Sequence, residues 1–324
     1  MSVATTTSSP VQGARPTEER ALPPPGRSVR LRRWVSRRPA LLGSVFMAPA
    51  ALVLLAFWAI PLALVVAFSF FHWTDGTQPR FNGLNEYREL FSSGLFWHSL
   101  VLTVIFALAT VLIGTLVSLV LALLVRSVLY AAGLFRAIYF LPYVTPIVAT
   151  STVWLWIYQP STGVLDRTLS AVGLPGSIAW VSYPDLALAS LIIYTIWYSF
   201  GFTTLLFLAG LTDIPVDCVE AAHLDGASTW QRLRWVVLPL LSPTTLFVIV
   251  IDTIAAFQAF TQIYALTNGG PINGTTTLTY LIYQLSFQYF HFGQASSAAT
   301  IFVLLVGLLV LVQFRLVRHN RRYS

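Results

Sequence analysis

The sequence of 324 residues contains no lysine, because all nineteen of its basic residues are arginine. This absence excludes chemistry that needs an amine, including nucleotide binding by a P-loop, in which a lysine holds the phosphates. Charged residues make up only 10% of the chain, against about 25% in an ordinary soluble domain. Hydrophobic residues make up 56%. The composition is that of a membrane protein.

Cysteine is almost absent as well, since Cys218 is the only one. A single cysteine excludes an intramolecular disulfide and gives no cysteine cluster for a metal ion. We therefore expect neither a metal site nor a redox function.

Residues 1–38 have a composition that cannot bury a core. They begin with MSVATTTSSP, continue through PPP and end in RSVRLRRWVSRRP, which is typical of a disordered segment. The early apolar core of a cleavable signal peptide is missing. We predict a disordered basic cytoplasmic tail, followed by a first apolar run that stays in the membrane as an anchor.

Long apolar stretches fill residues 39–324, which we expect to form one transmembrane domain. About 20 apolar residues span the hydrocarbon core as a helix. The expected spans lie near residues 42–70, 98–125, 137–158, 186–211, 241–265 and 295–316. The predicted fold class is an all-α, polytopic membrane protein with six transmembrane helices.

The arginines predict the orientation of these helices. Cytoplasmic connections carry an excess of basic residues. With the N-terminal tail inside, the inside connections and ends carry Arg30, Arg32, Arg33, Arg37, Arg38, Arg126, Arg136, Arg232, Arg234, Arg315, Arg318, Arg321 and Arg322, and the outside ones carry Arg80, Arg88 and Arg167. Both termini are therefore expected in the cytoplasm. The net charge of +7 reflects membrane orientation and does not indicate a nucleic-acid partner.

Residues 212–240 form the longest inside connection between spans, and the sequence of the wider loop, residues 212–243, predicts two short helices before the fifth span. Thr212 and Asp213 are suited to cap the first helix, and Gly226 to end it. Ser228 and Gln231 have the spacing of a capping box for the second helix. Pro239 and Pro243 predict a bend into the fifth span.

Two interpretations of this hairpin are open: a surface connection, or an element that docks on another protein. Its small residues, Ala221, Ala222 and Ala227, let another backbone approach closely, and the turn at Asp225 and Gly226 presents a rigid projection. The docking element is the better fit.

The same residues carry a resemblance to a known family. Glu220-Ala221-Ala222, Asp225-Gly226-Ala227, Leu238-Pro239 and Pro243 resemble the EAA motif of binding-protein-dependent ABC importer permeases. The resemblance extends to FNGLNEY before the second span, YFLP in the third, LTNGGP, and the run that ends in FGQASSAAT. Only the N-terminal tail lies outside it.

Within that family the chain looks like the carbohydrate-uptake class, of the maltose and glycerol-3-phosphate permease type. The resemblance implies a MetI-like permease core in a bacterial cytoplasmic membrane and a coupling helix that docks on a separate ATPase through Glu220, Ala221, Ala222, Asp225, Gly226 and Ala227. It implies two ATPase subunits, a second homologous permease, an extracytoplasmic binding protein and a small carbohydrate as partners. ATP and Mg²⁺ would be bound by the ATPase, so this chain would hold no cofactor and no catalytic residue.

The resemblance also indicates a substrate pathway. Counting from LTNGGP places Asp252, Ala255, Ala256 and Ala259 where the maltose permease contacts sugar, and counting from the EAA motif adds Thr195, Tyr198, Ser199 and Phe202. An acid at the depth of Asp252 is a functional candidate by default. The alternative is a carboxyl that bonds a neighbouring helix. Nearby residues mix rings with amides, as in a site that stacks and hydrogen-bonds polyols: Phe257, Gln258, Phe260, Gln262 and Tyr264. Alternating rings in a span more often serve packing, and we expect this of Phe257 and Phe260.

The spans contain an acid but no interior arginine, which favours a neutral sugar. An sn-glycerol-3-phosphate importer remains an alternative, as does an importer of a glycerophosphodiester such as glycerophosphocholine, whose choline could use Asp252 and aromatic rings. An ion-coupled secondary transporter and a structural membrane subunit without a pathway are alternatives of other classes.

Overall fold

The computed structural model describes residues 39–126, 132–174 and 176–320. The predicted tail, residues 1–38, lies outside the described residues. Contacts divide the chain into two compact units, a first that ends at Pro61 and a second that begins at Leu62. In the first unit the described residues form α2 (Pro39–Leu54), η1 (Leu55–Ala59), which is a π-helical turn, and the start of α3 (Ile60–Phe68).

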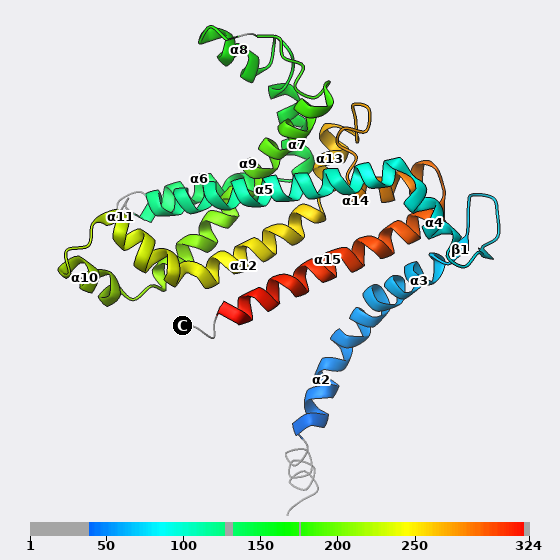
Figure 1. The fold of residues 1–324 in the computed structure, drawn as a ribbon, viewed down its shortest axis with the longest axis horizontal. Coiled ribbons are helices and arrows are strands. Elements are labelled where there is room, and N and C mark those ends of the chain that lie inside the picture. Colours follow the sequence, from blue (N-terminus) through cyan, green and yellow to red (C-terminus); the bar gives the residue numbers. More distant parts are fainter. Residues whose placement is uncertain (1–38, 127–131, 175, 321–324) are drawn as a thin grey trace, which may run out of the picture. The chain divides into compact units, whose positions relative to one another are not determined.

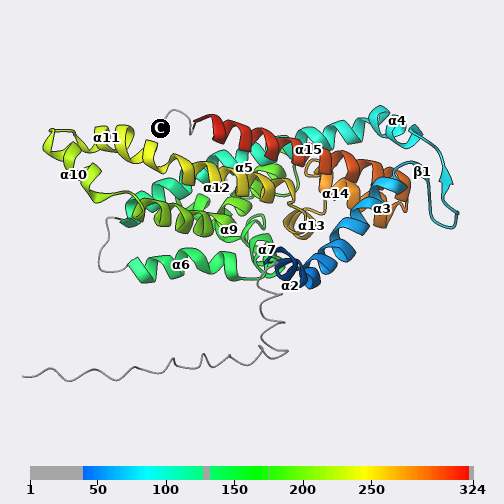
Figure 2. The ribbon, with the colours of Figure 1, turned by 90° about the horizontal axis from the view of Figure 1, so that it is seen from below.

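Long helices dominate the described part of the chain, and those of the second unit are seen in Figures 1 and 2. Five helices are long and apolar enough to cross a membrane: Phe46–Phe68, Gly94–Val125, Pro184–Thr212, Thr229–Phe257 and Phe292–Arg315. A bent pair, Ala137–Val144 with Ile147–Ile157, makes a sixth. The predicted all-α fold is confirmed, with five candidate spans among the described residues, or six if the bent pair is one span. Helices suit a membrane because they satisfy their backbone hydrogen bonds internally.

The remaining elements connect the spans or belong to them. In chain order they are β1 (Phe71–His72), β2 (Arg80–Phe81), α4 (Asn85–Ser92), α5 (Gly94–Arg126), α6 (Ala132–Val144), α7 (Ile147–Ile157), α8 (Val164–Ala171), α9 (Pro184–Thr212), α10 (Val216–Leu224), α11 (Thr229–Arg232), η2 (Leu233–Val237), α12 (Leu238–Phe257), α13 (Thr261–Leu266), α14 (Leu278–Tyr283), η3 (Gln284–Gln288) and α15 (Phe292–Asn320). Strands β1 and β2 pair antiparallel, with Phe71 opposite Phe81. Both views place α10 and α11 at one end of the second unit, and α4 and β1 at the other.

Helix α9 is the centre of the second unit, where it packs against α5, α6 and α12. Two glycines permit the closest approaches. A Cβ on Gly201 would collide with the backbone oxygen of Tyr139 in α6, and a Cβ on Gly210 would collide with Thr244 in α12. Small residues let helix backbones come together in this way. These contacts hold α6 near the middle of α9 and α12 near its C-terminal end.

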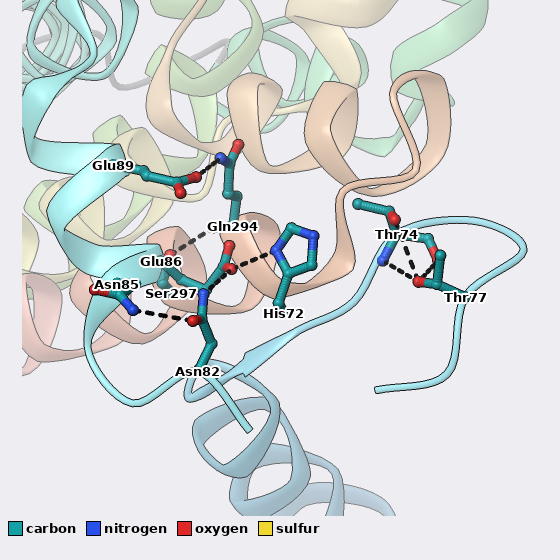
Figure 3. Close-up of polar contacts among 9 residues, drawn as sticks. All are labelled: His72, Thr74, Thr77, Asn82, Asn85, Glu86, Glu89, Gln294 and Ser297. Carbon is teal, nitrogen blue, oxygen red and sulfur yellow. Dashed lines mark hydrogen bonds and ion pairs between the residues drawn. The ribbon is translucent and has the colours of Figure 1, made fainter. Parts of the chain in front are cut away.

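Polar contacts fasten the end of the second unit that carries α4 (Figure 3). The buried carboxylate of Glu86 lies 2.8 Å from Nδ1 of His72 and accepts a hydrogen bond from Asn82 at 3.1 Å. Gln294 at the start of α15 donates to Glu89 at 2.8 Å. Gln294 of the FGQASSAAT run therefore joins α15 to α4, the helix that begins within FNGLNEY.

The third span differs from its predicted course, because it is not one helix. α6 and α7 are bent by 103° at the break between Val144 and Ile147. Pro146 precedes α7 with φ −54° and ψ 127°, an extended conformation that a helix cannot continue. The residue before a proline is also biased away from helical angles.

The fifth span was predicted at residues 241–265, and these bounds are wrong; the bend at Pro239 and Pro243 stays a prediction. The helix runs from Thr229 to Phe257, so it begins earlier and ends earlier. The π-helical turn η2 directly precedes α12. Pro239 lies at the start of α12, and Pro243 lies inside it, which helices in membranes tolerate.

The predicted cap of the first short helix is also wrong. α10 begins after Pro215 without a side-chain cap, and Asp213 ends α9 instead. The hydroxyl of Thr212 donates back to the carbonyl of Ala209 at 2.6 Å, so it serves the preceding helix.

Candidate functional site

A cavity of about 320 Å³ lies among the helices of the second unit. It is lined by Thr110 and Val111 of α5, Tyr143 of α6, Ile147 of α7, Thr195, Tyr198 and Ser199 of α9, Asp252, Ala255 and Ala256 of α12, and Gln258, Ala259, Phe260, Thr261 and Gln262 of the connection into α13. One carboxylate, hydroxyls, amides and aromatic rings surround the space. Such a mixture suits a ligand that is part polar and part apolar.

The structure brings together the positions predicted for the pathway. Thr195, Tyr198 and Ser199 lie on one wall of this cavity, and Asp252, Ala255, Ala256 and Ala259 lie on the other. Phe202 does not line it. Its ring stacks on that of Tyr143, with 4.7 Å between the centroids and 9° between the ring planes. Phe202 therefore packs against Tyr143, which lines the cavity. Whether these residues contact a substrate stays a prediction.

Asp252 makes the contact with a neighbouring helix that was weighed from the sequence, and it also lies at the cavity. Its carboxylate accepts a hydrogen bond from the hydroxyl of Thr203 on α9, at 3.3 Å to Oδ1 and 3.5 Å to Oδ2. It therefore contacts a neighbouring helix and also lines the cavity. These distances are long for a hydroxyl donor, which prefers about 2.7 Å. The carboxylate keeps acceptor capacity for a hydroxyl inside the cavity.

The break in the third span shapes one wall of the cavity. Tyr198 donates to the backbone oxygens of Tyr143 and Thr145 at 3.3 and 3.4 Å. Interrupting a helix at membrane depth leaves carbonyls without partners, and this arrangement is tolerated where the backbone faces protein or a cavity. The Tyr198 hydroxyl supplies a partner, so the break presents Tyr143 to the cavity.

Sequence reasoning missed several lining residues. Tyr143 was not expected in the pathway, although the Thr145-Pro146 pair inside an apolar run is a signal for the break that exposes it. Gln258 and Gln262, which the sequence offered as hydrogen-bonding partners for a polyol, do line the cavity. The packing role expected for Phe257 agrees with its burial in the core. For Phe260 the expectation is incomplete, because this ring packs on the core and also lines the cavity.

The predicted coupling segment is a compact helical hairpin. Gly226 follows α10 with φ +82°, and the N–H of Ala227 donates to the carbonyl of Ala222 at 3.0 Å, which is the pattern of a glycine-dependent helix end. Ser228 and Gln231 form both bonds of a capping box, as the sequence predicted.

The hairpin presents apolar side chains to its surroundings. Leu224 is 87% exposed, and Trp230 and Trp235 are 65% and 71% exposed. A hollow of about 400 Å³ next to the turn is lined by Ala222, Asp225, Gly226, Ala227, Gln231, Trp235 and Val236. Large exposed apolar side chains around a rigid turn indicate a surface that binds a partner.

Comparisons with known proteins agree with this geometry. The chain matches the model of the binding-protein-dependent transport system inner membrane component over residues 114–323. It is 34% identical over 283 residues to the probable ABC transporter permease protein YesP of Bacillus subtilis, covering 86% of this chain and 91% of that protein. It is 33% identical over 268 residues to the trehalose/maltose transport system permease protein MalF of Thermococcus litoralis, covering 82% and 89%.

A solved structure shares the fold. A chain of a bacterial alginate ABC transporter, in complex with an alginate pentasaccharide-bound periplasmic protein, superposes with a TM-score of 0.77 at 24% identity, covering 90% of this chain and 98% of that chain. The chain belongs to the family of binding-protein-dependent transport system inner membrane components. It is a transport permease of the inner membrane and not an enzyme.

Proposed function

We propose that this chain is the permease subunit of an ATP-driven importer that moves a sugar or oligosaccharide across the cytoplasmic membrane. It works with a second homologous permease, two ATPase subunits and an extracytoplasmic binding protein. The ATPase subunits bind ATP and Mg²⁺, and this chain holds no cofactor. Family membership and the trehalose/maltose relative support this proposal.

The observation that carries the proposal is the continuity between the hairpin and the cavity. The helix that begins at Thr229, directly after the hairpin turn, continues to Phe257 and carries Asp252, Ala255 and Ala256 into the cavity wall. At 1.5 Å per residue its 29 residues extend about 43 Å. A movement imposed on the hairpin by a docked ATPase is thereby delivered to the cavity.

The proposed roles of the predicted residues follow from their places. Glu220, Ala221 and Ala222 on α10 form the docking face, and Asp225, Gly226 and Ala227 form the turn that holds it. A ligand can shift an equilibrium between two conformations only if it binds them differently. ATP binding at the ATPase would favour one position of the hairpin, and so one opening of the cavity.

The cavity favours a neutral saccharide. Its lining contains the carboxylate of Asp252 and no arginine, so a phosphate or carboxylate would find no compensating charge among these described residues. Glycerophosphocholine is the second candidate, because Asp252 lies in the same cavity as the rings of Tyr143, Tyr198 and Phe260, and a carboxylate with rings suits a quaternary ammonium.

The orientation proposed from the arginines is retained. The hairpin lies on the cytosolic side together with both chain termini, and α4 and β1 lie outside. The arginine distribution and the docking surface of the hairpin support this orientation.

The test is uptake by the assembled transporter in proteoliposomes that contain the binding protein. We expect import of a labelled saccharide that stops when ATP is removed and survives collapse of the proton and sodium gradients. Uptake with the opposite dependence would identify an ion-coupled transporter instead. Cysteines placed at 195, 252 and 256 should react with a water-soluble reagent, and failure of all three to react would identify a scaffold without a pathway.

A further inference from the structure

Four aromatic rings form a continuous group that begins at the cavity and extends away from it. Phe260, which lines the cavity, lies 5.7 Å from Tyr264 and 5.1 Å from Tyr283, measured between ring centroids. Tyr264 and Tyr283 are 5.5 Å apart, and Tyr283 is 5.5 Å from Phe287. We call these four residues the outer aromatic surface.

The outer aromatic surface lies beyond the end of the fifth span. Phe260 and Tyr264 belong to the start of α13 and its approach, and Tyr283 and Phe287 belong to α14 and η3, outside the membrane-spanning helices of the described chain. These elements connect α12 to α15 at the opposite end of α12 from the hairpin (Figure 1). Under the orientation proposed above, the rings therefore adjoin the external entrance.

The rings remain accessible although they touch one another. Phe287 and Tyr264 are 66% and 47% exposed, whereas Phe260 and Tyr283 are half-buried. Rings that only fill a core would be closed to solvent, as Tyr280 is beside them. The exposed faces of Tyr264 and Phe287 are accessible to a ligand.

A rigid loop holds the two halves of the surface together. Thr279 donates to the carbonyl of Ala259 at 2.7 Å, and the Tyr280 hydroxyl donates to Asn268 at 2.8 Å. Gly269, with φ +76°, has no room for a Cβ, because Tyr280 fills that space. The positions of the rings are fixed before any ligand arrives, which lowers the entropy lost on binding.

We propose that the outer aromatic surface binds saccharide rings and extends the cavity outward, so that the transported substrate is a chain of two or more sugar rings. This inference rests on the proposed function. A sugar ring has a face of C–H groups and a rim of hydroxyls. The C–H face loses apolar area to water when it packs on an aromatic ring, and the hydroxyls can exchange hydrogen bonds with Tyr264 and Tyr283.

The other explanation for exposed aromatic rings at this depth is anchoring in lipid headgroups. Anchoring rings need no contact with the transport cavity, whereas this group ends on Phe260 in the cavity wall. The contacts between successive rings give a sugar chain a path of stacking positions from the outside inward. Rings that only anchor the protein in lipid would not need such a continuous path.

The test compares saccharides of different length in the assembled transporter with its binding protein. Proteoliposomes are supplied with labelled glucose, maltose, maltotriose, lactose and raffinose. The variants are Tyr264→Ala, Phe287→Ala and both together, with Tyr264→Phe as the conservative variant. Tyr289→Ala is the matched control, since Tyr289 is 52% exposed on the same connection but is not part of the surface.

We expect the double variant to lower uptake of the saccharides with two or three rings about tenfold and to change uptake of glucose less than about twofold. Tyr264→Phe should keep most of the activity, and Tyr289→Ala should resemble the unaltered chain. An equal fall for all sugars, or no fall, overturns the inference and leaves the proposed function standing. If the unaltered transporter imports glucose alone, the inference is also overturned and the proposed function stands. If it imports no saccharide, the proposed function is overturned.

Discussion

Gly226 is the residue on which the shape of the hairpin depends. Its φ of +82° is disfavoured for any residue with a Cβ and most strongly for a β-branched one. A Cβ at this position would meet nothing within 4 Å, so a substitution acts through backbone strain and not through a clash.

We therefore predict that Gly226→Val abolishes most uptake while the permease still assembles partly with its ATPase. Co-purification of the ATPase and saccharide uptake in proteoliposomes are the two measurements. Gly307→Val is the control, because Gly307 also has open space around it but lies within α15. Normal uptake by the Gly226 variant would remove the hairpin from the mechanism.

Asp252 offers a second prediction at the residue scale, because its hydrogen bond with Thr203 and its proposed contact with the substrate can be removed separately. Asp252→Asn keeps the shape of the side chain but removes its charge, whereas Thr203→Val removes only the hydrogen bond between α9 and α12. If the carboxylate serves the substrate, Asp252→Asn should lower saccharide uptake about tenfold, since hydrogen bonds to charged groups contribute about 1.5–3 kcal/mol. Thr203→Val should lower it less than about threefold.

Uptake and the thermal stability of the complex are measured for both variants. Equal losses of uptake and stability in the two variants would assign Asp252 to helix packing. Retention of full uptake by Asp252→Asn would exclude the carboxylate from the pathway.

At the scale of elements, local signals were readable from the sequence and the effects of prolines were not. The capping box at Ser228 depends on four consecutive residues, and it forms as predicted. The prolines behave differently from one another: Pro146 breaks the third span, while Pro142 and Pro243 remain inside helices. Neighbouring helices and local helical adjustments decide which proline bends a span, and a single sequence does not contain this information.

The connection between the third and fourth spans is organised around one carboxylate. Asp166 is buried, and it accepts hydrogen bonds from the backbone N–H groups of Ser161, Ser177 and Ile178 and from the indole of Trp180. Burial alone would raise the pKa of this carboxyl, but the hydrogen bonds outweigh it and hold the pKa below its usual range.

A lowered pKa makes the order of this connection dependent on pH. The ionised form is favoured by the fold, so its contribution is complete above the ordinary carboxyl pKa and is lost as the pH falls through the lowered value. Asp166→Asn should therefore speed hydrogen exchange across residues 158–183 at about pH 7, and it should differ less from the unaltered chain at an acid pH, as the pH falls through the lowered pKa.

The control for this measurement is Asp185→Asn, since Asp185 is exposed in the first turn of α9. It should leave exchange in residues 158–183 unchanged at both values of pH. Equal protection in the Asp166 and Asp185 variants at about pH 7 would show that the carboxylate does not hold the connection.

At the scale of the whole molecule, hydrophobic length predicted the number of spans, and the family resemblance predicted positions on two walls of the cavity. Tyr143 was missed because it enters the cavity only where the third span is interrupted, at Thr145. Of the outer aromatic surface, Phe260 and Tyr264 were noted from the sequence, but Tyr283 and Phe287 were not. Its rings come from segments some twenty residues apart, and only the loop around Gly269 brings them together.

Cys218 provides a direct test of orientation for the whole molecule. It is the only cysteine in the sequence, and it is exposed on α10. A membrane-impermeant maleimide should label it in inside-out vesicles or opened cells, and not in intact cells. A Cys218→Ser chain with a cysteine at Thr77, which is exposed between β1 and β2, should show the reverse. Labelling of Cys218 in intact cells would show that the topology is the reverse of the one proposed.

The continuous span from Thr229 to Phe257, which includes the π-helical turn η2, gives the hairpin a long lever arm. A tilt of about 10° at one end of a helix about 43 Å long displaces the other end by about 7 Å, so a small rotation at the hairpin produces a displacement of molecular size at the cavity.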